Sequence, residues 1–200
     1  MDYTTLANVR ADAHIVETTD DALISRKITQ ASRAIDRLVT GREDAIDYFK
    51  SEAISGEILS GYRNPLIDNH GRLLAWPHKP IITAVSAIAF RMDPTQGWQS
   101  LDTQSLMISG GKAVEVWGTF LRGRSMVQIS YTGGLGAATA NLPDDLQELA
   151  TLLTIRFYKE SQSGMSDTIG INDLGTVQYI KALPIRVQDG LARYTRNVPW

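Results

Sequence analysis

The stretch ISYTGGLGAATANLPDDLQELA, residues 129–150, decides how this chain folds. It begins with the alternating apolar side chains of a strand, continues through a glycine cluster, and ends in an amphipathic pattern that predicts a helix after Pro143. Nucleotide-binding loops begin in a similar way. The glycines therefore mark either a phosphate site or a corner of the chain.

A dinucleotide-binding loop needs the pattern G-x-G-x-x-G, with the helix starting inside it. Gly134 and Gly136 match the first two glycines, but Thr139 stands at the third position. The helix expected from Pro143 begins too late for its N–H groups to reach a phosphate held by the glycines. No P-loop lysine follows. The pattern favours a corner that turns the strand toward the helix.

Three helices are expected before residue 161, over residues 4–12, 19–40 and 143–160. Thr18 or Thr19 is placed to cap the second helix, and Gly41 to end it. The apolar residues of the second helix are spaced by four and three and form one stripe: Ile24, Ile28, Ala31, Ile35 and Leu38. The third helix carries one apolar face of Leu146, Leu149, Leu153 and Phe157, and a second apolar side of Leu152, Ile155 and Tyr158. A helix that is apolar on two sides is buried deeply or shared with a neighbour.

Short β-type runs occupy about residues 80–132 and are separated by turn-rich segments, which predicts an antiparallel β-meander. The runs are IITAVSAIAFR, SLMIS, KAVEVW and SMVQISY. Residues 45–59 favour a strand only weakly, and residues 62–71 are rich in turn formers. A loop is expected over about residues 160–175, then a strand from residue 176 and a short helix from Pro184.

These elements predict an α+β fold that is mainly helical. Two principal helices pack with the antiparallel β-meander, and an extended C-terminal arm follows. Residues 1–160 are expected to form a core domain. Residues 161–200 are expected to add the loop, the strand, the short helix and the arm.

Composition excludes several classes of protein. The chain has no cysteine, so disulfides and thiolate chemistry are absent. The N-terminal residues have neither a basic start nor an apolar core, and the longest apolar run is far below the roughly 20 residues that span a bilayer. A soluble protein of a reducing cytoplasm is expected. The net charge of −2 argues against a protein whose main task is to grip phosphates.

The residues typical of catalysis do not form a recognisable constellation. His14, His70 and His78 lie in unrelated contexts without the spacing of metal ligands. The acidic pairs at residues 20–21 and 144–145 both precede expected helices, where a negative charge stabilises the helix end. No serine occupies a nucleophile elbow. We therefore expect no catalytic residues, no metal and no cofactor.

The order of these motifs resembles the head–tail connector, or adaptor, proteins of long-tailed bacteriophages. The matching segments, in order, are TLANV, TTDDALISRKITQASRAID, TGR, KPIITAVSAI, VQISYTGGLG, LPDDLQELATLLTIRFY and LPIRVQDGLARY. The likeness covers most of the chain. The exceptions are residues 42–77 and the terminal TRNVPW.

The resemblance implies a structural virion protein without enzymatic activity. Members of the family form a ring, commonly of twelve subunits, beneath the portal vertex. The ring extends the DNA channel and gives a platform for a stopper or tail protein. DNA would pass through the channel without specific binding, and no membrane is involved. The expected location is the neck of the virion, after assembly in the host cytoplasm.

The residues expected to bind the portal lie at the C-terminus, which the resemblance implies is the end that engages it. They are Arg193, Tyr194, Arg196 and Trp200, which are of types that often anchor interfaces. In the alternative interpretation, Tyr194 and Trp200 fold back on their own domain. Two further classes stay open: a stopper-like or other tail-completion protein, and a hydrolase that uses His70 or His78.

Overall fold

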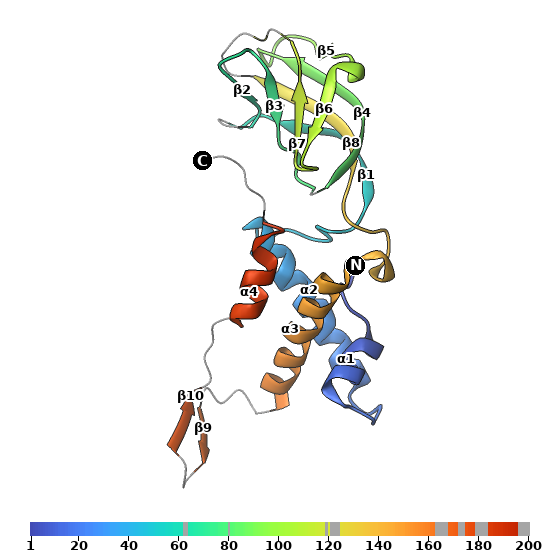
Figure 1. Ribbon diagram of the computed structural model, residues 1–200, viewed down its shortest axis with the longest axis vertical. Helices are drawn as coiled ribbons and strands as arrows, with labels where there is room; N and C mark the ends of the chain where they lie inside the picture. The colour runs from blue at the N-terminus through green and yellow to red at the C-terminus, as the bar shows by residue number, and fades with distance from the viewer. Residues whose placement is uncertain are drawn as a thin grey trace. The chain divides into compact units, whose positions relative to one another are not determined.

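The computed structural model describes residues 1–61, 64–79, 81–118, 120, 125–162, 168–171, 175–178 and 184–195. These residues form two compact units (Figure 1). The helical unit contains Met1–Asp47 and Ala138–Thr195, and the β unit contains Tyr48–Ala137. The β unit is thus inserted in the sequence between two parts of the helical unit.

Four helices build the helical unit: α1 (Leu6–Ala13), α2 (Asp21–Thr40), α3 (Asp144–Gln162) and α4 (Ile185–Ala192). The two long helices α2 and α3 pack against each other, and α1 and α4 each contact both of them (Figure 1). The predicted ranges of α2 and α3 are confirmed to within two residues at each end. Among the described residues, no helix is both long enough and apolar enough to cross a membrane.

The apolar stripe of α2 faces the core along most of its length. Ile24, Ile28, Ala31 and Ile35 are buried, but Leu38 is 41% exposed. Val39, four residues after Ile35, takes the core position in the last turn. Gly41 ends the helix in the left-handed conformation, as expected. Asp20 stands at the N-cap position in place of Thr18 or Thr19, without a capping side-chain hydrogen bond.

A buried carboxylate ties the end of α2 to the segment that follows it. The Asp36 side chain is fully buried, accepts a hydrogen bond from the Tyr3 hydroxyl, and accepts another from the Asp47 N–H at 3.0 Å. The Arg33 guanidinium lies 3.7 Å from Asp36 and 2.8 Å from Asp47. A buried charge with these partners avoids the cost of an unpaired carboxylate.

Helix α4 approaches α3 closely because of Gly190. A Cβ atom at this position would lie 2.7 Å from Leu149 Cδ1. Val187 and Leu191, one turn apart on α4, are also buried. The short helix expected from Pro184 is therefore confirmed, and it belongs to the helical unit.

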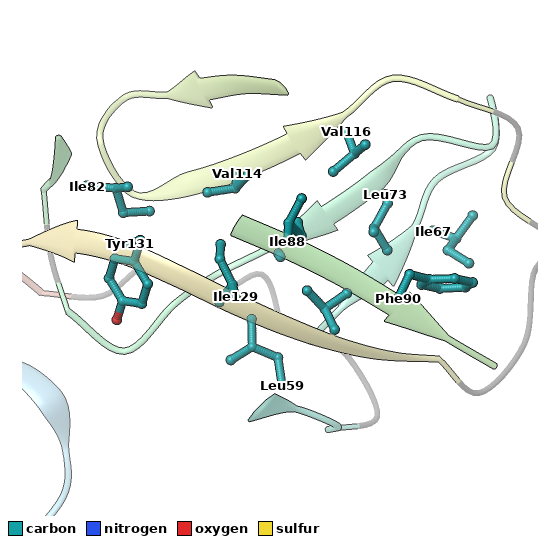
Figure 2. Packing of buried hydrophobic residues seen from close by; sticks show 12 residues of the cluster. Leu59, Ile67, Leu73, Ile82, Ile88, Phe90, Val114, Val116, Ile129 and Tyr131 are labelled. Carbon is teal, nitrogen blue, oxygen red and sulfur yellow. The ribbon is translucent and has the colours of Figure 1, made fainter. Parts of the chain in front are cut away.

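The β unit contains two four-stranded antiparallel sheets. The first sheet has the order β1 (Glu52–Leu59), β8 (Met126–Gly133), β4 (Ile82–Arg91) and β5 (Gln99–Ser100). The second has the order β2 (Leu66–Ile67), β3 (Leu73–Ala75), β7 (Ala113–Val116) and β6 (Leu106–Ser109). Side chains of both sheets enclose one core, as Figure 2 shows for Ile88 and Ile129 facing Leu73 and Val114.

The predicted meander over residues 80–132 is wrong in its topology. Its strands exist, but β4 pairs with β8, while β6 and β7, which lie between them in the sequence, pair with each other in the other sheet. Strands β1, β2 and β3, which lie before residue 80, complete the two sheets. The reason is burial: two sheets can each cover the apolar face of the other, which a single meander cannot do.

The fold class is α+β, but the expectation of a mainly helical fold is wrong. The helices stay in one unit, and the residues between α2 and α3 form a β unit of comparable size. The predicted division at residue 160 differs from the observed units, because α4 packs with α3.

Two further strands, β9 (Thr168–Ile171) and β10 (Gly175–Gln178), pair antiparallel. β10 agrees with the strand expected from residue 176, whereas β9 lies where a loop was expected. The expected C-terminal arm beyond Thr195 lies outside the described residues.

Candidate functional site

The glycine cluster of residues 133–136 is a crossing point, by which we mean a place where two segments of the backbone pass in direct contact. The segment after β8 runs beside the segment before β1: the Leu135 N–H donates to the Phe49 carbonyl, and the Ser51 N–H donates to the Gly136 carbonyl, both at 2.8 Å. Gly134 has φ +118°, and a Cβ atom there would lie 2.6 Å from Ser51 Cα. Only glycine fits such an approach.

This corner leaves no role for a nucleotide. The backbone next to Gly134 is occupied by Lys50 and Ser51, where a phosphate would have to lie. Helix α3 starts at Asp144, after a short 3-10 helix at Thr139–Asn141. The prediction that the glycines serve the geometry of the chain agrees with these contacts.

A second cluster joins His78, one of the candidate catalytic histidines, to Glu57 and Tyr131. The Tyr131 hydroxyl donates to Glu57 Oε2 at 2.6 Å, and the His78 backbone N–H donates to Glu57 Oε1 at 3.0 Å. The His78 ring contacts the same carboxylate. The Lys79 N–H in turn donates to the Tyr131 hydroxyl at 3.1 Å. These bonds fasten β1, β8 and the segment after β3 together.

Glu57 is held in its charged form. Burial raises the pKa of Glu57, but the hydrogen bonds from His78 and Tyr131 and the nearby His78 ring together lower this pKa below its ordinary value. A carboxylate with a lowered pKa accepts hydrogen bonds well and is a poor general acid. The cluster therefore has the chemistry of a structural clasp.

The other titratable candidates lie apart from one another. His14 caps the C-terminal end of α1, and His70 lies in the turn between β2 and β3. Asp144 and Asp145 are in the first turn of α3, as predicted. Within the part of the chain that the structure describes, no group of three His, Asp or Glu side chains is arranged to hold a metal ion.

Two of the four predicted portal-binding residues contact their own domain. The Arg193 guanidinium forms an ion pair with Asp145, and the Tyr194 hydroxyl donates to Asp145 Oδ2 at 2.8 Å. Arg193 still has a largely exposed side chain. Arg196 and Trp200 lie outside the described residues. Asp145 thus holds the two residues that directly follow α4.

Sequence reasoning missed an apolar surface on the β unit. On the side of the second sheet that faces away from the core, Leu66, Leu74, Glu115 and Met107 form a row of register partners across four strands. Trp117, 56% exposed, lies beside this row with the Arg72 guanidinium 5.2 Å from its ring centre. We call these six residues the outer sheet face.

The residue types of the outer sheet face are those that carry binding energy at protein interfaces. Trp and Arg are enriched among such residues, and exposed apolar patches of this kind mark interaction sites. The signal was present in the sequence AVEVW, residues 113–117. Its alternation places Glu115 and Trp117 on the side opposite Val114 and Val116.

Comparisons with known proteins rest on structure alone. No protein-family model matches the chain, and no curated protein does. A chain from the virion of a native gene transfer agent particle aligns over 96% of this chain and 89% of its own length, with a TM-score of 0.56 and 17% sequence identity. The two chains share a fold.

A second solved structure gives the same result. A chain in the neck of an empty gene transfer agent particle with C6 symmetry matches at a TM-score of 0.54 and 18% identity. The alignment again covers 96% of this chain and 89% of that chain. The likeness includes both the helical unit and the β unit, since it extends over nearly all residues.

Proposed function

We propose that this chain is a structural neck protein of a phage-like particle, and within the neck a head–tail connector (adaptor). It forms a closed ring beneath the portal, extends the DNA channel and offers a platform for a stopper or tail protein. The observation that carries this proposal is the fold shared over 96% of the chain with a chain in the neck of a gene transfer agent particle. The motif order that resembles phage adaptors points the same way.

A ring is supported by the structure of that neck, which was computed with C6 symmetry. The family resemblance favours twelve subunits, a multiple of six. Closed rings form when each subunit presents two different, complementary surfaces to its neighbours. The net charge of −2 fits a channel through which DNA slides without being held.

The C-terminus is our candidate for the portal contact. Arg193 and Tyr194 leave α4 at a place fixed by Asp145, and Arg196 and Trp200 follow in the sequence. In this proposal Asp145 holds Arg193 and Tyr194, and the basic and aromatic residues of the C-terminus bind the portal. The role of the protein is structural and not enzymatic.

A stopper-like role is the second candidate. The structural similarity to neck proteins is compatible with this role as well, since a neck contains proteins other than the adaptor. The β unit also favours it, because this unit is larger than the sequence-based adaptor interpretation predicted. The two roles differ in the partner: an adaptor binds the portal directly, whereas a stopper needs the adaptor ring beneath which it docks. The long helices α2 and α3 favour the adaptor.

The test is to mix the purified chain with portal rings of the same particle and to image the complex by electron microscopy. We expect a ring of this chain in direct contact with the portal. A particle in which the chain appears as isolated copies, or not in the neck, overturns the proposal. A ring that forms only below another neck protein decides for the stopper-like role. The hydrolase alternative would require an activity that is lost on changing His70 or His78.

A further inference from the structure

The exposed side of α2 is basic, although it belongs to an acidic unit. Residues 1–47 and 138–195 carry 11 basic and 16 acidic side chains, for a net charge of −5. On α2, however, Arg26, Gln30, Arg33 and Arg37 recur every three or four residues and form one stripe, bordered by Lys27. Arg33 is paired with Asp36 and Asp47, so the positive charge of the stripe comes from Arg26 and Arg37 together with Lys27. Between Asp21 and Asp36 the helix has no acidic residue, and Asp36 is buried. We call this stripe the cationic face.

An exposed leucine lies beside the basic side chains of this face. Leu38 directly follows Arg37 and is 41% exposed, while the core position of that turn is taken by Val39. Leu38 lies about 100° around the helix from Arg37, so it borders the last turn of the stripe. An aliphatic side chain at the edge of exposed arginines suits a protein surface that carries both carboxylates and an apolar residue. It is less suited to DNA, whose backbone offers only phosphates and sugars to such a face.

The same unit carries a surface of the opposite kind. A groove between α3 and α4 is lined by Leu149 and Ile185, and Ile185 is 76% exposed. Its acidic side chains are Asp145, Glu148 and Asp189, with Asp144 exposed next to them. The two arginines of the groove, Arg186 and Arg193, are engaged by Glu148 and Asp145. Three carboxylates and two arginines leave the groove with a net charge of −1, and Asp144 beside it adds another negative charge.

We infer that the cationic face of one copy docks into the α3–α4 groove of the next copy, and that this contact closes the ring. The two surfaces carry net charges of opposite sign, and each has an exposed aliphatic residue: Leu38 at the edge of the cationic face and Ile185 in the groove. Contacts between two cationic faces, or between two grooves, place like charges together and are disfavoured. The two surfaces share no residue, so each copy can use both at once and form a head-to-tail ring. This inference rests on the proposed function and specifies its subunit contact.

The absence of cysteine from the chain permits a direct test by cross-linking. Leu38→Cys and Ile185→Cys are made in separate chains, mixed, and treated with a short bis-maleimide. We expect mixed dimers and no larger product, because each chain carries a single cysteine and can be cross-linked only once. Neither variant alone should cross-link. Ile58→Cys, an exposed position on β1, replaces Leu38→Cys in a matched control and should give no product with Ile185→Cys.

Charge reversal tests the electrostatic part of the contact. The variant R26E/R37E with Leu38→Cys should lower the yield of mixed dimers about tenfold or more, since like charges then face each other. Adding E148K/D189K to the Ile185→Cys partner should restore much of the yield. Raising the salt concentration to about 0.5 M should weaken the contact in the unreversed pair.

Several results would overturn the inference while leaving the proposed function intact. One is a ring in the assembled neck together with no mixed dimer in solution or in the particle. Another is cross-linking of Leu38→Cys with itself. A third is a loss of DNA retention in R26E/R37E particles with unchanged cross-linking, which assigns the cationic face to DNA. If the chain is missing from the neck, the proposed function fails, whatever the cross-linking shows.

Discussion

At the scale of single residues, Gly134 carries the tightest constraint in the glycine corner. Its φ of +118° and the nearness of the Lys50 carbonyl exclude a side chain for two separate reasons. We expect Gly134→Ala to destabilise the β unit by about 2–4 kcal/mol. Urea unfolding followed by tryptophan fluorescence suits the measurement, since Trp76, Trp98 and Trp117 all lie in this unit.

The control for Gly134 is another glycine of the same unit. Gly97 has open space around it and an ordinary φ, so Gly97→Ala should change stability by less than about 0.5 kcal/mol. Gly110, also in the β unit, has φ +55° but open space, so it separates the effect of the backbone conformation from that of the close contact. Gly110→Ala should cost roughly 1 kcal/mol. Equal stability of Gly134→Ala and Gly97→Ala would contradict the crossing-point interpretation.

Glu57 gives the β unit a specific pH dependence. Because the pKa of Glu57 is lower in the folded than in the unfolded chain, its contribution is fully present above the unfolded value of about 4.3. It is lost as the pH falls through the folded pKa. Glu57→Gln should therefore reduce stability at pH 7 by on the order of 1–3 kcal/mol.

The pH profile distinguishes this effect from a general loss of packing. The difference between wild type and Glu57→Gln should shrink as the pH falls below the unfolded value of about 4.3, and it should level off below the folded pKa, where both side chains are neutral. Glu43→Gln, at an exposed position, is the matched control and should follow the wild-type curve. A difference that stays constant from pH 7 to pH 3 would show that the Glu57 charge does not matter.

At the scale of elements, the packing of α2 against α3 is the main source of order in the helical unit. Ile28 and Leu153 lie mid-helix and are buried. Truncating either to alanine should cost about 2–5 kcal/mol. Leu38→Ala, on α2 but exposed, should cost less than about 1 kcal/mol. Thermal unfolding followed by far-UV circular dichroism compares the three, and equal melting temperatures would show that the buried faces are misassigned.

The elements that sequence predicted best are those set by local periodicity. The spacing of apolar residues places α2 and α3, and alternation places β4, β6, β7 and β8. Local periodicity could not predict that β4 pairs with β8, because this pairing joins residues that are far apart in the chain. The short strands β2 and β3 were hidden in a turn-rich segment, since two or three residues carry too little periodicity to be recognised.

At the scale of the whole molecule, the candidate surfaces depend on contacts that no local pattern reveals. The Glu57 clasp joins three segments, and no pattern near Glu57 in the sequence predicts that His78 and Tyr131 are its partners. The outer sheet face, by contrast, follows from alternation once the strand is known. Motif order in the sequence thus suggested a family, while the candidate interaction surfaces required the fold.

The attachment of the chain to the portal can be tested by removing residues 196–200. Deletion after Thr195 keeps α4 and the bonds from Arg193 and Tyr194 to Asp145, so the helical unit should unfold at an unchanged temperature. It removes Arg196 and Trp200, which are of types that dominate binding energy at interfaces. We expect co-sedimentation with portal rings to be lost and DNA-filled heads to leak or to lack tails. A chain of full length with GSGSG in place of RNVPW should fail in the same way, because length alone does not supply the contacts. Unchanged portal affinity in both variants would place the anchor elsewhere on the molecule.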